Sequence, residues 1–268
     1  MEIPNFENKA ELSAFLMANK SLLIQSKRAQ IKHSDILTLS PTLEMVDKAD
    51  KGEPMTIKAV INTIGVLDSH GDVHMKGIWN KTVKENKNVY LLQEHKMQFD
   101  KIISDNVKAS VQTLSWKDLG VKAEGNTEAL VFEARLDEDR NPFMVKQYRN
   151  GWVKNHSVGM QYVKINLAVN DPEMKEEYEE WTKTIDKILN KKDAEKQGYY
   201  FTVYEAKMFE GSAVPIGSNQ ITPTLETNLD KDNDLDASSQ KEKPSADTSE
   251  EQEKESPTLK SNIILIHY

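Results

Sequence analysis

Hydrophobic and polar residues alternate along much of the middle of the chain, which is the pattern of half-buried β-strands. Residues 56–66 show it clearly, because Ile57, Ala59 and Ile61 fall on one side of the predicted strand. Other short runs of apolar and β-branched residues end in turns that are rich in glycine, asparagine or aspartate. These runs predict further strands at residues 89–92, 102–114, 129–136, 157–169 and 199–209.

Apolar residues at helical spacing predict helices outside these strands. Asn8 followed by Glu11 has the form of a helix start, in which the asparagine side chain caps the first turn. Asn141 and Pro142 open another helix, which ends before Gly151. The remaining helices are expected at residues 21–31, 76–86 and 172–192.

The order of these elements shows no regular βαβ repeat, which favours an α+β fold that is mainly β. We expect a mainly antiparallel sheet or barrel with helices around it. Residues 1–52 are expected to form a peripheral helical N-terminal arm. Residues 53–222 form the main domain, in which the charged helix 172–192 is an insertion.

The charge is concentrated near the C-terminus. The chain has a net charge of −8, and residues 223–260 alone hold 11 acidic residues and five lysines without any aromatic residue. Such a segment cannot bury enough apolar surface to offset the entropy of ordering it. We therefore expect residues 223–268 to be a disordered acidic tail, and the net negative charge argues against a dedicated nucleic-acid binder.

Composition excludes several further classes of site. The chain has no cysteine, so it has no disulfide framework, no thiol nucleophile and no cysteine-ligated zinc. It contains no apolar run of about 20 residues that would span a membrane. Its polar first 20 residues do not resemble a signal peptide. These features predict a soluble intracellular protein that does not bind a membrane.

Ser157 is the residue around which candidate chemistry gathers. It stands between a polar turn and a β-rich run, and Gly159 would let other backbone approach it closely. A nucleophilic serine needs a base and donors for the oxyanion. His95 and Glu210 each follow a strong strand and are candidates for the base and for the group that orients it. Each residue also has a purely structural interpretation, and the Gly-x-Ser-x-Gly nucleophile elbow is absent.

Two other groups compete for these roles. Asp68, His70, Asp72 and His74 alternate, and their oxygen and imidazole ligands would suit zinc or manganese, although the same residues also fit a turn. His156 is adjacent to Ser157 and is a rival base. Neighbouring residues of a strand point to opposite faces, so His156 should reach Ser157 poorly.

Four stretches resemble, in the same order, motifs of the prohead (capsid maturation) proteases of tailed bacteriophages. The resemblance covers about residues 55–222. The stretches are Asp68-x-x-Gly71-Asp72-Val73 with Gly77 following, Leu91-Leu92-Gln93-Glu94-His95, His156-Ser157-Val158-Gly159-Met160, and Phe209-Glu210-Gly211-Ser212-Ala213-Val214-Pro215.

The resemblance implies a serine endopeptidase in which Ser157 is the nucleophile and His95 the catalytic histidine. Glu210 would be the third member, and the backbone N–H groups of Val158 and Gly159 would bind the oxyanion. The family is distantly related to the herpesvirus assemblins, which implies an antiparallel β-barrel surrounded by helices. No metal or cofactor is expected.

The same resemblance implies the biological setting. The substrates would be the major capsid protein, a scaffolding protein and the chain itself, inside the assembling procapsid in the host cytoplasm. Self-association there would raise the local concentration. Three alternatives remain open: a non-catalytic scaffold or assembly protein built on a protease-like domain, a metal-dependent hydrolase that uses the cluster from Asp68 to His74, and a structural protein whose motif matches are chance.

Overall fold

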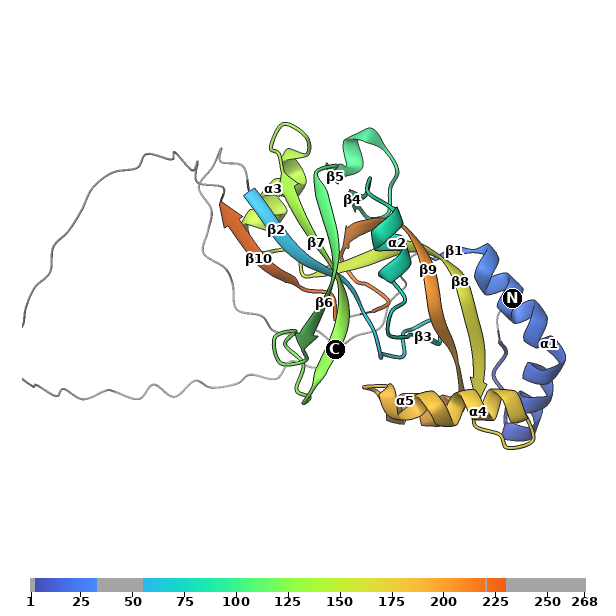
Figure 1. Ribbon diagram of the computed structural model, residues 1–268. Helices are drawn as coiled ribbons and strands as arrows, with labels where there is room; N and C mark the ends of the chain where they lie inside the picture. The colour runs from blue at the N-terminus through green and yellow to red at the C-terminus, as the bar shows by residue number, and fades with distance from the viewer. Residues whose placement is uncertain (1–2, 33–54, 220, 230–268) are drawn as a thin grey trace, which may run out of the picture. The chain divides into compact units, whose positions relative to one another are not determined.

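The computed structural model describes residues 3–32, 55–219 and 221–229, and it shows a mixed α+β fold built mainly of strands (Figure 1). The strands are β1 (Ile31–Lys32), β2 (Met55–Thr63), β3 (Asp72–His74), β4 (Tyr90–Gln93), β5 (Ile102–Ser104), β6 (Val107–Ser115), β7 (Asn126–Leu136), β8 (Asn155–Val169), β9 (Tyr199–Val214) and β10 (Thr224–Leu229). The helices are α1 (Lys9–Ala29), α2 (Asn80–Glu85), α3 (Pro142–Arg149), α4 (Lys175–Thr184), α5 (Lys191–Gln197) and the short η1 (Phe99–Lys101) and η2 (Ile185–Lys187).

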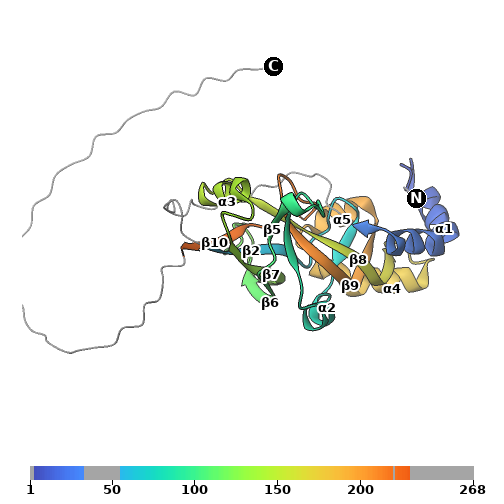
Figure 2. The same cartoon turned by 90° about the horizontal axis from the view of Figure 1, so that it is seen from above.

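The strands form two sheets. One has the order β1-β8-β9-β4-β5, with β3 also paired to β9, and the other has the order β10-β2-β7-β6. The long strands β8 and β9 pair antiparallel along almost their whole length (Figure 2), whereas β3 and β4 run parallel to β9. The first sheet is therefore mixed. The prediction of a mainly antiparallel sheet did not include the parallel pairings of β3 and β4 with β9.

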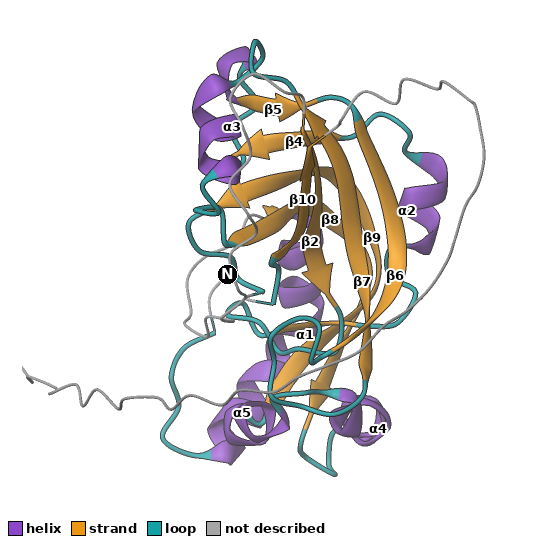
Figure 3. Cartoon of the chain, turned by 90° about the vertical axis from the view of Figure 1, so that its left-hand side faces the viewer, coloured by secondary structure: helices purple, strands orange, loops and turns teal. Residues whose placement is uncertain are grey.

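The sheets do not close into the expected barrel. Among the described strands, no ladder joins an edge of one sheet to the other sheet, and closure requires such hydrogen bonds. The apolar faces of β2 and β7 instead share one core with β4, β8 and β9. Phe132 of β7 lies so close to β9 that a Cβ on Gly211 would stand 2.5 Å from its ring. Figure 3 shows the strands gathered in this arrangement, with α2 and α3 at their sides.

The N-terminal helix is part of this body and not a peripheral arm. α1 is one continuous helix, where two were predicted, and its cap is as predicted because Asn8 Oδ1 accepts the Glu11 N–H at 2.9 Å. Leu16 and Leu23 are buried in the main core. Lys27 reaches the buried carboxylate of Asp72 and donates to the His70 carbonyl at 2.9 Å. Residues 33–52 of the predicted arm lie outside the described residues.

The C-terminal boundary lies later than predicted. Residues 224–229 form β10, which pairs with β2, so the body extends past residue 222. The acidic composition of the longer window concealed this short strand. Residues 230–268 of the predicted tail lie outside the described residues.

The predicted helical insertion at 172–192 becomes α4, η2 and α5, and α5 ends at Gly198 in the left-handed conformation, with φ 81°. The rings of Trp181 and Tyr200 are tilted relative to each other with centroids 5.0 Å apart, so the apolar stripe of this insertion packs against β9. None of the helices that the structure describes is long and apolar enough to cross a membrane.

Candidate functional site

Ser157 lies near the start of β8, on the face of the sheet that points away from the core. It is directly opposite Ser212 of β9, and Gly159 is directly opposite Glu210. Residues that are directly opposite one another share a face of the sheet, as do residues two apart on one strand. Ser157, Gly159, Glu210 and Ser212 therefore face the same side. The three that carry side chains are buried, with exposed fractions of 3% or less.

Gly159 makes room for the carboxylate of Glu210. A Cβ built on Gly159 would stand 2.0 Å from Glu210 Oε1, which is impossible without a shift. The sequence predicted a close approach of other backbone at this glycine. The structure shows that a side chain makes the approach instead: the carboxylate of Glu210 lies against Gly159 of β8, two residues from Ser157.

His95 reaches this face through a left-handed turn after β4. β4 runs parallel to β9 and ends at Gln93, after which Glu94 and His95 have φ values of 52° and 58°. Such values are rare outside glycine and mark strained backbone, often at functional sites. The turn carries the imidazole back over β9. There Nδ1 of His95 and Oε1 of Glu210 are 2.6 Å apart.

Ser212 joins the histidine to the glutamate a second time. Its Oγ accepts the backbone N–H of His95 at 3.0 Å and donates to Glu210 Oε2 at 2.6 Å. Sequence analysis placed Ser212 inside a quoted motif without giving it a role. The available signal was the Glu-x-Ser spacing, which puts both side chains on one face of a strand.

The arrangement has the geometry of a base that is oriented by an acid. An ionised carboxylate can only accept a hydrogen bond, so the short contact places a proton on Nδ1 of His95. Nε2 is then the basic nitrogen of the neutral ring, as general-base catalysis requires. The structure thus brings His95 and Glu210 into direct contact and places Ser157 beside Ser212, which bonds to both.

The predicted oxyanion donors are not brought together. Consecutive residues of an extended strand direct their N–H groups to opposite edges. The His156 N–H points away from β9, to the Thr222 carbonyl at 3.1 Å. By alternation along the regular register of 155–159, Val158 points away from β9 and Gly159 toward it. In this conformation the two N–H groups therefore cannot bind one oxyanion. Of the two, only Val158 directs its N–H away from β9.

His156 lies on the opposite face from Ser157, as alternation predicted. It is fully buried, its Nδ1–H donates to the Thr222 carbonyl at 3.0 Å, and its Nε2 accepts the Tyr148 hydroxyl at 2.9 Å. Burial lowers the pKa of His156 to about 4. Its neighbours therefore hold it neutral in the core, and it does not serve Ser157.

The lowered pKa of His156 predicts that the folded protein loses stability in acid. In the unfolded chain a histidine takes up its proton near pH 6.5, but folded His156 does so only near pH 4. Between these values the unfolded state binds more protons, so stability falls as the pH falls. We expect His156 to contribute a loss of up to about 3 kcal/mol.

The measurement is urea unfolding at pH 7 and pH 4.5 for wild type and for His156→Gln. Glutamine cannot titrate, so the wild type should lose more stability than the variant on acidification. An equal loss in both proteins would contradict the assignment.

The alternating Asp68–His74 segment is engaged in structural contacts. Asp72 binds Lys27 and accepts the Tyr162 hydroxyl at 2.8 Å, and Asp68 Oδ1 accepts two backbone N–H groups of its own turn. Burial and the nearby charge of Asp72 raise the pKa of Asp68 to about 7. Among the described residues, no group of three or more His, Asp or Glu is placed to hold a metal ion.

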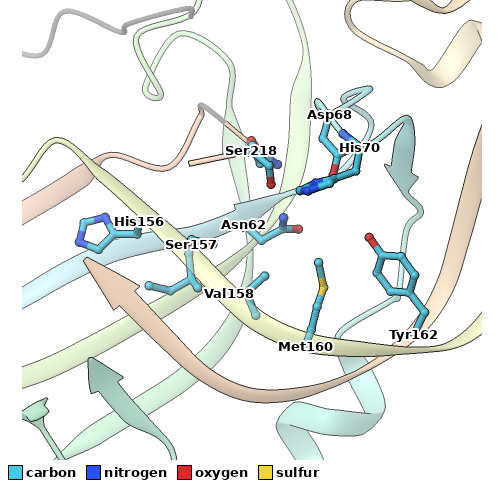
Figure 4. Close-up of a pocket in the computed structure, with 11 residues that line it drawn as sticks. Asn62, Asp68, His70, His156, Ser157, Val158, Met160, Tyr162 and Ser218 are labelled. Atoms are coloured by element: carbon cyan, nitrogen blue, oxygen red, sulfur yellow. Dashed lines mark hydrogen bonds between the residues drawn. The ribbon is translucent and has the colours of Figure 1, made fainter. Parts of the chain in front are cut away.

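A narrow pocket separates this turn from β8. Figure 4 shows Met160 and Tyr162 rising from β8 toward Asn62 and toward the turn that carries His70. The pocket encloses about 10 Å³, which is close to the least space that holds one water molecule. It is therefore too small to admit a peptide.

Comparisons with protein-family models, with curated proteins and with solved structures found no match to this chain.

Proposed function

We propose that this protein is a serine endopeptidase that uses Ser157, His95 and Glu210. The observation that carries the proposal is the 2.6 Å contact between Glu210 Oε1 and His95 Nδ1, on the face of the sheet that also carries Ser157. A buried carboxylate that orients an imidazole next to a serine is the arrangement of acyl-transfer catalysis.

The reaction then proceeds in two halves. Ser157 Oγ attacks the scissile carbonyl while Nε2 of His95 takes the hydroxyl proton, and the same nitrogen gives that proton to the leaving amine. The acyl-enzyme is hydrolysed when His95 takes a proton from water, the resulting hydroxide attacks the ester, and the proton returns to Ser157. Glu210 stays ionised, holds the ring and stabilises its charged form.

The positions of the four motif stretches support membership of the prohead protease family. The first stretch leads into β3, the second covers β4 and its turn, the third lies on β8 and the fourth on β9. All four strands belong to one sheet, in which β9 pairs with each of the others. Chance matches scattered along a chain need not meet in this way. The substrates we propose are capsid or scaffolding proteins and the chain itself, inside an assembling procapsid.

The burial of Ser157 indicates that the site is closed in this conformation. Only 3% of Ser157 is exposed. A peptide therefore reaches this serine only after the parts of the chain that cover it move. Met97 and Phe99 follow His95 and are 72% and 94% exposed. Exposed apolar side chains next to a site are suited to contact with another protein. Association within a shell would therefore serve as the signal that opens the site.

The proposal is tested by Ser157→Ala. Wild type and variant are each co-expressed with a candidate capsid or scaffolding protein, and the products are weighed by mass spectrometry. Wild type should give discrete truncations, and the variant should give none because the nucleophile is gone. Ser110→Ala, on the other sheet, should cleave as wild type does.

A second candidate function is a non-catalytic assembly protein, and the burial of Ser157 is the observation that favours it. It predicts identical product masses for wild type and Ser157→Ala, with shells that still assemble. That outcome would withdraw the roles of His95 and Glu210.

A chelator should have no effect under the serine mechanism, whereas a metal-dependent hydrolase would lose activity.

A further inference from the structure

Ser212 lies inside the fourth motif stretch, beside Glu210 on the same face, but the proposed mechanism gives it no role. Its exposed fraction is 0%, and its hydroxyl makes one bond as acceptor and one as donor. Both partners belong to the proposed catalytic residues: the backbone of His95 and the carboxylate of Glu210. A hydroxyl that only packed within the sheet would not need to bond to both groups.

The acceptor bond acts on strained backbone. Glu94 and His95 have left-handed φ values that side-chain-bearing residues rarely adopt. Such a turn persists only where its surroundings hold it. The Glu94 N–H donates to the Ala213 carbonyl at 3.0 Å, and the His95 N–H donates to Ser212 Oγ. Ser212 therefore holds the residue whose ring must be placed.

The donor bond acts on the carboxylate. Ser212 binds Oε2 of Glu210, and this leaves Oε1 to face His95 Nδ1. The bond at Oε2 opposes rotation of the carboxylate, so Oε1 stays directed at the His95 ring. Both ends of the His95–Glu210 pair are thus anchored on one hydroxyl.

We infer that Ser212 is a positioning residue, which fixes the His95 turn and the Glu210 carboxylate together and so sets the orientation of the catalytic base. The inference rests on the proposed function for its catalytic consequence. Its structural core, the coupling of His95 to Glu210 through Ser212, can be measured without any activity.

The test compares wild type with Ser212→Ala in the full chain, with a fluorophosphonate as the probe of serine nucleophilicity. The variant should react with Ser157 about 10- to 100-fold more slowly, as is typical when a supporting hydrogen bond is removed. The loss should lie in the rate of the covalent step and leave the affinity for the probe unchanged. In proton NMR, the downfield signal of the His95 Nδ1–H should broaden or move upfield.

Ser104→Ala is the matched control. Ser104 of β5 is also a buried serine, 3% exposed, and its hydroxyl donates to the Arg135 carbonyl at 2.6 Å, away from the site. It should lose stability but keep both the labelling rate and the NMR signal. Ser212→Cys keeps nearly the same size with a weaker donor, so it reports on the bond even if the alanine variant folds poorly.

Two results would distinguish failure of the positioning role of Ser212 from failure of the protease proposal. Labelling of wild type and Ser212 variants at equal rates, with an unchanged His95 signal, would overturn the positioning role and leave the protease proposal intact. If wild type is not labelled at Ser157 even in assembling shells, where the site is expected to open, but the His95 signal still shifts in Ser212→Ala, the coupling holds and the protease proposal fails.

Discussion

Glu210→Gln should lower the rate of Ser157-dependent cleavage by about 10³- to 10⁴-fold. Glutamine has the same shape, so the fold should be retained. Its amide can present N–H to Nδ1 of His95, and the ring then adopts the tautomer with its proton on Nε2. That nitrogen cannot accept the Ser157 proton. The measurement is the initial rate of self-cleavage or of fluorophosphonate labelling, with circular dichroism to confirm folding.

Glu180→Gln is the matched control for this change. Glu180 of α4 is also a largely buried carboxylate, and it accepts hydroxyls from Thr202 at 2.7 Å and from Tyr204 at 2.5 Å. It packs against β9 away from Ser157, so its loss should affect stability and not the rate. A Glu210→Gln protein that works within threefold of wild type would remove Glu210 from the mechanism.

Gly159→Ala should inactivate the protein through Glu210 and not through Ser157. The new methyl group would stand 2.0 Å from Oε1, so the carboxylate must leave its place and His95 loses its partner. We expect a rate loss of about 100-fold or more, since the base is then no longer oriented. We also expect a loss of stability of about 1–3 kcal/mol, as is typical of overpacking. Both are measured on the purified variant by labelling and by urea unfolding.

A double-mutant cycle identifies the cause. Glu210→Ala removes the carboxylate that the new methyl group would meet, so adding Gly159→Ala to it should cost little further rate or stability. The two changes should therefore be strongly non-additive. Additive losses in the double variant would mean that the glycine is needed for another reason, such as the conformation of β8 itself.

Local features were predicted well because their causes are local. The cap at Asn8 and the start of α3 at Asn141 each depend on residues three positions apart. Alternation correctly placed His156 on the face opposite Ser157. The predictions failed where a long-range contact decides. β10 pairs with β2, and the separate helix predicted at residues 21–31 is instead the second half of α1, which ends at Ala29 and packs against β8.

The sequence by itself determined which side chains share a face. Ser157-x-Gly159 and Glu210-x-Ser212 are each two residues apart, and a strand places such pairs on one side. Only the tertiary structure decided that these faces meet. The register that sets Gly159 against Glu210, and the parallel placement of β4 that brings in His95 from 115 residues away, depend on hydrogen bonds between distant strands and on packing in a shared core. No local pattern encodes that register, because shifting a strand leaves its own alternation unchanged.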